Sequence, residues 1–245
     1  MFHQLLTTDY LFWLVALAFY FLDSIKLVSK SQILIIETIT GKFKPSFSFN
    51  TFEIKGQQVQ LLNIFFPFTG FFRLDSSPNQ SPSINFENTK QELIKLQKMV
   101  LPFKVISLVS FIYLLLGPVL TLYYGLGATL FFLLPLHLTS LLILLTLLLI
   151  SRKKFGFTYG VIASIFFDCL VVPAYLPNIV RKIFSKKVFL CDGYFFALNT
   201  CLNKDREELE YNITRKIAQM SDYQEDFDTK KNELYLKLLG IKYDK

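Results

Sequence analysis

The stretch VISLVSFIYLLLGPVLTLYYGLGATLFFLLPLHLTSLLILLTLLLI, residues 105–150, contains no Asp, Glu, Lys or Arg. A membrane-spanning helix needs about 20 apolar residues, so this stretch has the length of two spans. We expect spans at 105–123 and 128–150, joined through the glycines of YYGLGA into a transmembrane hairpin. The pair Gly117-Pro118 lies inside the first of them, where proline usually bends a helix.

A further apolar run, YLFWLVALAFYFL, occupies residues 10–22. It is short for a crossing, so a span here must continue past Asp23 and Lys26 to about residue 28. These two residues are three apart and can pair on one helix face, but a snorkelling lysine is the favoured interpretation of Lys26. The cations follow the run, which favours an N-terminus outside and the next segment in the cytoplasm.

The segment SIFFDCLVVPAYLPNIVRKIF, residues 164–184, is the fourth candidate. A carboxylate such as Asp168 costs about 2.5–3.5 kcal/mol at a helix centre in the bilayer. Pro173 and Pro177 interrupt a regular helix, and a crossing would export the basic cluster that follows. We therefore expect a re-entrant or interfacial segment, with a fourth span as the alternative.

Between the first two spans the apolar period changes to two, which is typical of strands. We expect short antiparallel strands at about 33–40, 46–55 and 59–64, and their apolar face needs a cover from the tail or from a partner. The aromatic run in NIFFPFTGFFRLD, residues 63–75, favours a loop on the membrane interface, with packing under the sheet as the alternative.

A Ser-, Pro- and Asn-rich linker at 76–88 precedes TKQE, in which Thr89 and Glu92 match a capping box. A helix starting there would place Leu93, Leu96 and Val100 on one face. Beyond residue 204, apolar residues recur at helical spacing and predict an amphipathic helical tail.

The fold class is thus an integral membrane α+β protein with three or four transmembrane helices, a small antiparallel β-sheet and a helical tail. Its parts are an anchor helix (1–29), a cytoplasmic β-domain with an aromatic loop (30–75), a linker and juxtamembrane helix (76–104), the transmembrane hairpin (105–150), the re-entrant, interfacial or fourth membrane segment (151–184) and the cytoplasmic helical tail (185–245).

Motifs for catalysis are missing from the sequence. It has no P-loop, no G-x-G-x-x-G, no G-x-S-x-G and no H-E-x-x-H. There are only two histidines and an odd number of cysteines, Cys169, Cys191 and Cys201, without a C-x-x-C pair. We identify no catalytic residues, no metal site and no cofactor, and the missing motifs favour a chain that is not an enzyme while leaving the question open.

Two groups of polar residues stand out as candidate sites. The intramembrane polar candidates are Asp23, His137 and Asp168. A relay between His137 and Asp168 is possible in principle, but a structural hydrogen bond is the favoured interpretation. The candidates for an anionic lipid headgroup are Asn178, Arg181, Lys182, Lys186 and Lys187.

Two functions fit these features. The first is a membrane-anchored interaction or assembly protein that presents the β-domain and tail to a cytoplasmic protein partner or to a second copy. The second is a component of a lipid-handling membrane enzyme or transporter that uses Asp168 with Arg181 and Lys182. The net charge of +7 is scattered without a recognition motif, so membrane lipids, anionic ones above all, are expected partners and nucleic acid is not. A plasma or bacterial inner membrane is the expected location.

Overall fold

The computed structural model describes residues 2–29, 32–46, 53–55, 57–75, 86–186, 193–200 and 210–215. The chain divides into two compact units. Unit 1 comprises Met1–Lys26, Leu61–Gly70 and Ile94–Lys187, and unit 2 comprises Leu27–Gln60, Phe71–Leu93 and Val188–Lys245.

Unit 1 is helical. Its elements are α1 (Phe2–Ser24), most of α2 (Phe86–Phe155), α3 (Tyr159–Val171), the 3₁₀ helix η1 (Pro173–Asn178) and α4 (Ile179–Ser185). The long element α2 leaves helical geometry at Gly125, where φ is 77° and ψ is 162°. This backbone region is open essentially only to glycine. The predicted turn in YYGLGA is therefore a true reversal, whereas the helix continues through Pro118.

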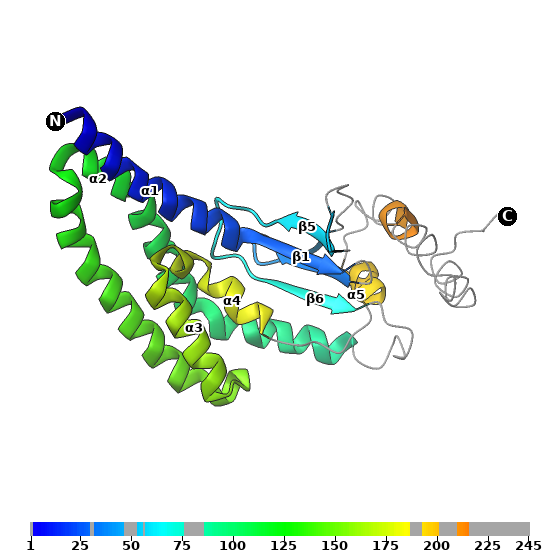
Figure 1. The fold of residues 1–245 in the computed structure, drawn as a ribbon. Coiled ribbons are helices and arrows are strands. Elements are labelled where there is room, and N and C mark those ends of the chain that lie inside the picture. Colours follow the sequence, from blue (N-terminus) through cyan, green and yellow to red (C-terminus); the bar gives the residue numbers. More distant parts are fainter. Residues whose placement is uncertain are drawn as a thin grey trace. The chain divides into compact units, whose positions relative to one another are not determined.

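A hydrogen bond across α2 shows that the element folds back on itself. The hydroxyl of Tyr113 lies 2.8 Å from Nδ1 of His137, 24 residues further on. In a straight helix these residues would be separated by about 36 Å. Figure 1 shows the two arms of α2 running beside each other. Close to the reversal, the backbone N–H of Leu126 donates to Oδ2 of Asp9 at 3.3 Å, which attaches the start of α1 there.

The prediction of three or four transmembrane helices is wrong. Among the described residues, α2 is the one helix long and apolar enough to cross a membrane by length and composition. Segments 105–123 and 128–150, expected as two separate spans, both belong to it. The first predicted span fails because the chain changes from helix to strand at Ile25. The apolar run 10–22 alone is only about 20 Å long, against a hydrocarbon core of about 30 Å.

The fourth candidate span is also too short. The helix α3 has 13 residues and ends at Val171, where the backbone becomes extended. At about 1.5 Å per residue it is about 20 Å long. The hydroxyl of Thr158 caps its first turn by accepting from the N–H of Val161 at 3.3 Å. Pro173 then begins η1, and Pro177 lies within it, so both prolines interrupt the α-helix as expected.

Unit 2 contains most of two small three-stranded sheets. The first has the order β3-β2-β6, formed by β3 (Phe43–Ser46), β2 (Gln32–Glu37) and β6 (Phe71–Asp75). Both partners pair antiparallel to β2, with Ile35 opposite Pro45 and Phe72. The second has the order β1-β5-β4, formed by β1 (Ile25–Ser29), β5 (Gln57–Leu61) and β4 (Glu53–Ile54).

The strand prediction is correct only in part. The strands β2, β3, β4 and β5 lie within or overlap the predicted ranges, but β1 was expected to belong to a membrane helix and β6 to an aromatic loop. Residues 47–52, in the middle of the expected second strand, lie outside the described residues.

One face of the β3-β2-β6 sheet is covered by a helix of the tail, α5 (Gly193–Thr200). The rings of Phe196 and Phe72 meet edge to face with centroids 5.7 Å apart. A Cβ on Gly193 would lie 3.2 Å from Leu74 and 3.3 Å from Ile33, so the helix start approaches the sheet closely. The apolar face of the sheet that needed a cover therefore obtains one from the chain itself.

The helix predicted to begin at Thr89 begins earlier, at Phe86. Thr89 is buried within its first turns instead of capping the end. The predicted stripe is correct, because Leu93, Leu96 and Val100 are all buried. Of the remaining tail, only 210–215 are described, as a short helical segment, and the rest of the expected amphipathic helices lies outside the described residues.

Candidate functional site

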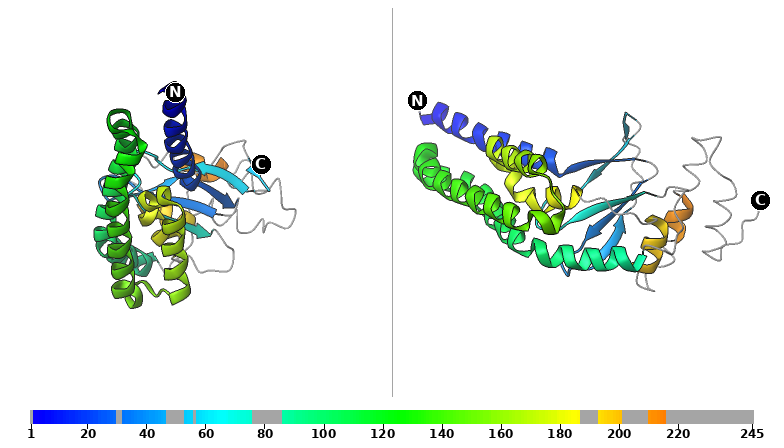
Figure 2. Two further views of the ribbon diagram at one scale, coloured as in Figure 1. Left: turned by 60° about the vertical axis from the view of Figure 1, so that its left-hand side comes forward. Right: turned by 90° about the horizontal axis from the view of Figure 1, so that it is seen from below.

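The predicted site residues of the 164–184 segment meet the end of α1 inside unit 1. The 3₁₀ helix η1 contacts α1, and Figures 1 and 2 show η1 and α4 beside the C-terminal half of α1. The hydroxyl of Ser107 on α2 donates to the carbonyl of Pro177, which fixes the end of η1. Asn178 and Arg181 follow three residues apart and are both buried.

The guanidinium of Arg181 is the centre of a buried hydrogen-bond network, although the residue is only 1% exposed. One terminal nitrogen donates to Oγ of Ser24 at 3.2 Å and to Oδ1 of Asn178 at 2.9 Å. The other donates to the carbonyl of Phe66 at 3.1 Å and to the carbonyl of Asn63. Arg181 thus joins α4, the end of α1 and the loop 62–70.

The acceptors of Arg181 are themselves fixed by further bonds. The amide nitrogen of Asn178 donates to Oγ of Ser24 at 3.3 Å, and that hydroxyl donates to the carbonyl of Tyr20 at 3.0 Å. The N–H of Leu62 donates to the carbonyl of Ser24 at 3.0 Å, and the hydroxyl of Tyr20 donates to the carbonyl of Ile64. We call Tyr20, Ser24, Asn178 and Arg181 the Arg181 cluster.

An ionic cluster lies beside it and consists of Asp23, Lys26, Asp168 and Lys182. Nζ of Lys182 lies 3.4 Å from Oδ1 of Asp23 and 3.3 Å from Oδ2 of Asp168. Asp23 also pairs with Lys26 at 3.8 Å, although the snorkelling lysine was the favoured prediction and the two residues do not share a helix face, because α1 ends at Ser24. The carboxylate of Asp168 is 49% exposed, so its pair with Lys182 is the more solvated of the two.

Burial and charge act in opposite directions on the two cations. Burial lowers the pKa of Arg181 to about 10, which still leaves it charged at neutral pH. Burial alone would also lower the pKa of Lys182, but Asp23, the thiol of Cys169 and Asp168 together raise it above its ordinary value. Lys182 therefore stays charged and bound to its carboxylates.

This arrangement joins the elements of unit 1 through hydrogen bonds and ion pairs. The terminal nitrogens of Arg181 donate to neutral oxygens of the protein, and both carboxylates of the ionic cluster face lysines. Within the described part of the chain, no three His, Cys, Asp or Glu side chains are grouped as metal ligands. A buried charge is tolerated only when most of its polar atoms are paired or hydrogen-bonded. The two clusters meet this condition in large part, although Nε of Arg181 and Oδ2 of Asp23 are buried without a partner.

The candidate headgroup residues differ in exposure. Asn178 and Arg181 are buried, Lys182 is partly buried, and Lys186 is exposed just beyond α4. Lys187 lies outside the described residues. Lipid binding by this group stays a prediction, and Lys186 is the described member with an accessible ammonium group.

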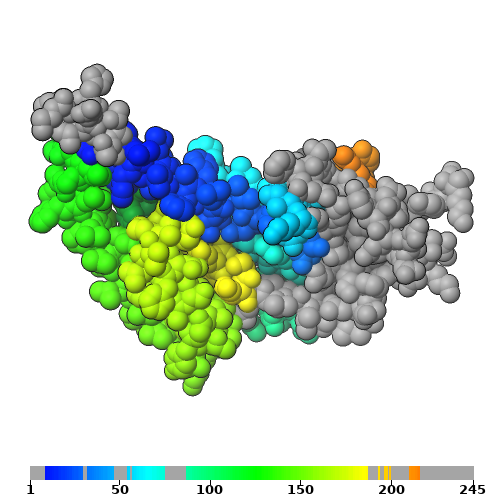
Figure 3. Space-filling model, in the orientation of Figure 1, coloured from blue at the N-terminus to red at the C-terminus, as the bar shows by residue number. Residues whose placement is uncertain are grey.

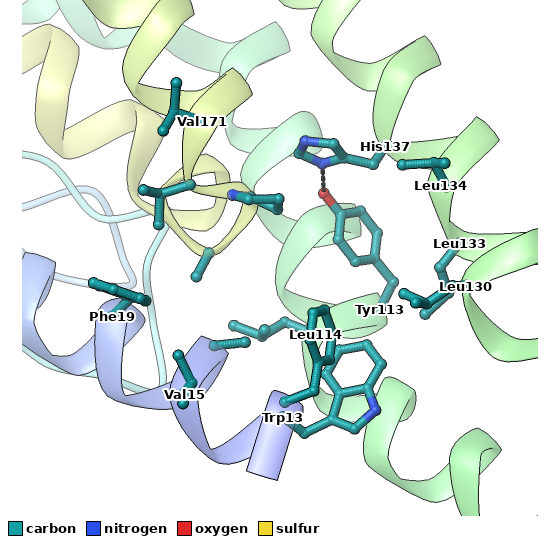
Figure 4. A pocket seen from close by; sticks show the side chains of 15 residues that line it. Trp13, Val15, Phe19, Tyr113, Leu114, Leu130, Leu133, Leu134, His137 and Val171 are labelled. Carbon is teal, nitrogen blue, oxygen red and sulfur yellow. Dashed lines mark hydrogen bonds between the residues drawn. The ribbon is translucent and has the colours of Figure 1, made fainter. Parts of the chain in front are cut away.

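The third intramembrane candidate, His137, bonds Tyr113, while Asp168 bonds Lys182. Figure 4 shows the imidazole and the phenol pointing toward one another beside a cavity. The cavity has a volume of about 290 Å³ and lies between α1, both arms of α2 and the start of η1. Besides Tyr113 and His137, its walls are apolar side chains and the indole of Trp13.

Sequence reasoning missed several residues that complete these sites. Trp13 donates from Nε1 to Oγ1 of Thr121 at 2.8 Å, and its ring fills the space over Gly117, where a Cβ would lie only 2.1 Å away. Ser24 and Tyr20 hold the Arg181 cluster. A polar residue inside an apolar run was the available signal for Ser107, Tyr113 and Thr121, but their partners are far away in the sequence.

Comparison with known proteins gives no relative: no protein-family model, no curated protein and no solved structure matches this chain.

Proposed function

We propose that the chain is a membrane-anchored interaction protein, in which unit 1 sits in lipid and unit 2 offers a water-exposed surface to a protein partner or a second copy. The observation that supports this most strongly is the contrast between the surfaces of the two units. One surface is suited to hydrocarbon and the other to water.

The helices of unit 1 expose large apolar side chains along their length. Figure 3 shows α1 adjoining η1 and α3 on one face of this unit. Soluble proteins rarely expose contiguous apolar surface of this kind, whereas a lipid-facing surface requires it. The exposed residues include Leu11, Leu14 and Leu22 on α1, Val119, Leu122, Phe131, Phe132, Leu142 and Ile150 on α2, and Phe167 and Val171 on α3.

The described surface of unit 2 is mostly polar. Its exposed positions include Lys42, Lys44, Lys55, Gln57 and Arg73 on or next to the strands. Because α5 covers the apolar face of the β3-β2-β6 sheet, a partner is expected to bind the polar surface and the sheet edges. The edge strand β3 contains Lys44 and Pro45. A charged residue and a proline on an edge strand hinder its pairing with strands of other chains, so a specific partner is favoured over aggregation.

The basic residues support an orientation. The last turn of α2 carries Arg152, Lys153 and Lys154, whereas the reversal at Gly125 has no charged neighbours in the sequence from 105 to 150. Basic segments beside membrane helices remain in the cytoplasm. We therefore propose that this basic end faces the cytoplasm and that the Gly125 reversal, with Asp9 beside it, faces the other side.

Site-specific photo-crosslinking in cells tests this function. A photoreactive benzophenone amino acid at Lys44, Lys55 or Arg73 should give one discrete adduct, either with another protein or at twice the mass of the chain. The matched control places the same group at Leu142, which is exposed on α2 and is expected to give lipid adducts only. Absence of a discrete protein adduct at all three unit 2 positions would refute the proposal.

A further inference from the structure

The last turn of α2 carries three adjacent cations, Arg152, Lys153 and Lys154, which we call the α2 basic cluster. Lys153 and Lys154 are exposed, and Arg152 is partly exposed. The sequence contains no Asp or Glu from residue 93 to residue 167. In the described part of the chain, none of the three cations forms an ion pair with a carboxylate. Their charge is therefore open to an anion from outside the chain.

A tight turn between α2 and α3 fixes the α2 basic cluster. The N–H of Gly156 donates to the carbonyl of Lys153 at 3.3 Å. The N–H of Phe157 donates to the carbonyl of Arg152 at 3.1 Å. Gly156 has a φ of 69°, which a glycine adopts without strain at the end of a helix. The rings of Phe155 and Phe157 are buried and stack with their centroids 5.2 Å apart, and Figure 1 shows the chain reversing here into α3.

The guanidinium of Arg152 is oriented by two contacts. Its Nε donates to the carbonyl of Phe157 at 3.2 Å, and its Cζ lies 3.6 Å from the centroid of the Tyr159 ring. These contacts use Nε and one face of the guanidinium, and within the described residues the two terminal nitrogens make no hydrogen bond. A guanidinium donates two parallel hydrogen bonds to two oxygens of a phosphate. Because Arg152 is already held in place, it loses little side-chain freedom when it binds one.

The α2 basic cluster has the depth of a lipid headgroup. The segment 128–150 of α2 is about 34 Å long, close to a hydrocarbon core of about 30 Å, and the cluster begins two residues later. On the other arm of α2, Lys104 directly precedes the charge-free stretch. The rings of Phe103 and Phe155 lie 5.8 Å apart, so both ends of this stretch are at one level. Cations at that level meet the headgroup layer.

An apolar strip adjoins the cluster on the same side of α2. Ile143, Ile150 and Lys154 follow one another at spacings of seven and four residues, which places them on one helix face. Ile150 is 70% exposed, and Ile143 is exposed as well. A ligand here meets cations at one end and apolar side chains along its length. A phosphate ion or an acidic protein segment matches only the cations, whereas a phospholipid matches both.

We propose that the α2 basic cluster binds an anionic phospholipid. Arg152 donates to two oxygens of its phosphate, Lys153 and Lys154 contribute charge, and an acyl chain lies along Ile150 and Ile143. The negative charge of the ligand follows from the unpaired cations, the phosphate from the oriented guanidinium and the acyl chain from the apolar strip. The inference rests on the proposed membrane embedding of unit 1.

Native mass spectrometry of the detergent-solubilised full chain measures this binding. The chain is titrated with dioleoyl phosphatidylglycerol and, separately, with dioleoyl phosphatidylcholine, which has the same acyl chains but no net charge. We expect phosphatidylglycerol to bind roughly 100-fold more tightly, because each of three cations contributes about fivefold near a headgroup. Equal affinities would overturn the proposal. Incorporation of the chain into phosphatidylcholine nanodiscs reads out membrane embedding separately, so failure of the lipid site and failure of embedding are distinguishable.

Matched double variants locate the site. Lys153→Gln with Lys154→Gln should lower the affinity for phosphatidylglycerol roughly 25-fold. The control, Lys95→Gln with Lys186→Gln, removes two exposed cations elsewhere in unit 1 and changes the net charge equally. It should lower the affinity less than about twofold, because salt screens distant charges. An equal loss in both double variants would overturn the proposal, since the lipid would then respond to net charge alone. Melting curves by circular dichroism verify that both are folded.

The phosphate contact is tested at Arg152 itself. Arg152→Gln should lower the affinity for phosphatidylglycerol by at least about fivefold. Arg152→Lys should recover only part of this loss, because an ammonium group does not make the two parallel bonds of a guanidinium. Full recovery would overturn the assignment of Arg152 as the phosphate ligand. Inorganic phosphate at the concentration of the lipid should not displace phosphatidylglycerol, and displacement would overturn the choice of a phospholipid over a free anion.

Discussion

Replacement of Arg181 by methionine should strongly destabilise unit 1. Methionine retains most of the apolar stem but removes the four hydrogen bonds from the terminal nitrogens to Ser24, Asn178, Asn63 and Phe66. Bonds to a charged group are worth about 1.5–3 kcal/mol each, or about 6–12 kcal/mol for four. The burial of the guanidinium offsets several kcal/mol of this gain.

The expected net loss for Arg181→Met is about 3–5 kcal/mol, because buried acceptors are left without a donor. A change of this size corresponds to a fall in Tm of about 6–20 °C for a chain of this length. The control is Lys186→Met, which removes a cation five residues later from an exposed position. It should change Tm by less than about 2 °C, since surface substitutions lie within about 0.5 kcal/mol.

Thermal unfolding of the detergent-solubilised full chain, followed by circular dichroism, measures both variants. Flotation with anionic liposomes, performed in parallel, separates a structural role from a headgroup role. The structural account would be refuted if the Arg181→Met variant had the same Tm as the Lys186→Met variant but no longer bound liposomes. That result would identify Arg181 as a headgroup ligand.

Three further substitutions test the fold of unit 1. Gly125→Ala should lower the free energy of unfolding by about 1–3 kcal/mol, because alanine does not tolerate φ of 77° with ψ of 162°. Gly127→Ala is the control, because a Cβ added there would meet equally open space, and it should be nearly neutral in the same unfolding assay. Gly117→Ala should displace the Trp13 ring, because the new Cβ would lie 2.1 Å from it, and a shift of the tryptophan emission maximum would report this; an unchanged spectrum would contradict the packing. Asp23→Asn should lower Tm more than Asp168→Asn, because the carboxylate of Asp23 is only 11% exposed and that of Asp168 is 49% exposed; the reverse order in the melting temperatures would argue against the buried pair with Lys182.

The sequence predicts the local features of this fold better than its long-range ones. The charge-free stretch 105–150 correctly predicts helix and a reversal at its glycines, because both depend on neighbouring residues. The predicted number of spans was wrong because apolar composition does not reveal that Ile25 begins a strand. This strand, β1, pairs with β5, which is distant in the sequence. The strand β6 was missed for the same reason, since its phenylalanines read equally well as an interface loop.

The candidate site shows the same division. Asp23, Asp168 and Lys182 were identifiable as polar residues in or beside apolar segments, and they do meet. Arg181 was expected to reach a headgroup because the sequence does not reveal its true acceptors. These are mainly backbone carbonyls, 115–118 residues away in the chain, and a serine, 157 residues away. Backbone acceptors carry no signature in a sequence, so the Arg181 cluster becomes visible only in the folded chain.

The central claim is that unit 1 anchors the chain in a bilayer through α2 and its adjoining apolar surface. Alkaline carbonate extraction of membranes that contain the full chain tests it directly, because this treatment releases peripheral proteins and retains embedded ones. We expect the chain to remain with the membrane pellet and to be released only by detergent. Recovery of folded chain in the carbonate supernatant would contradict the claim.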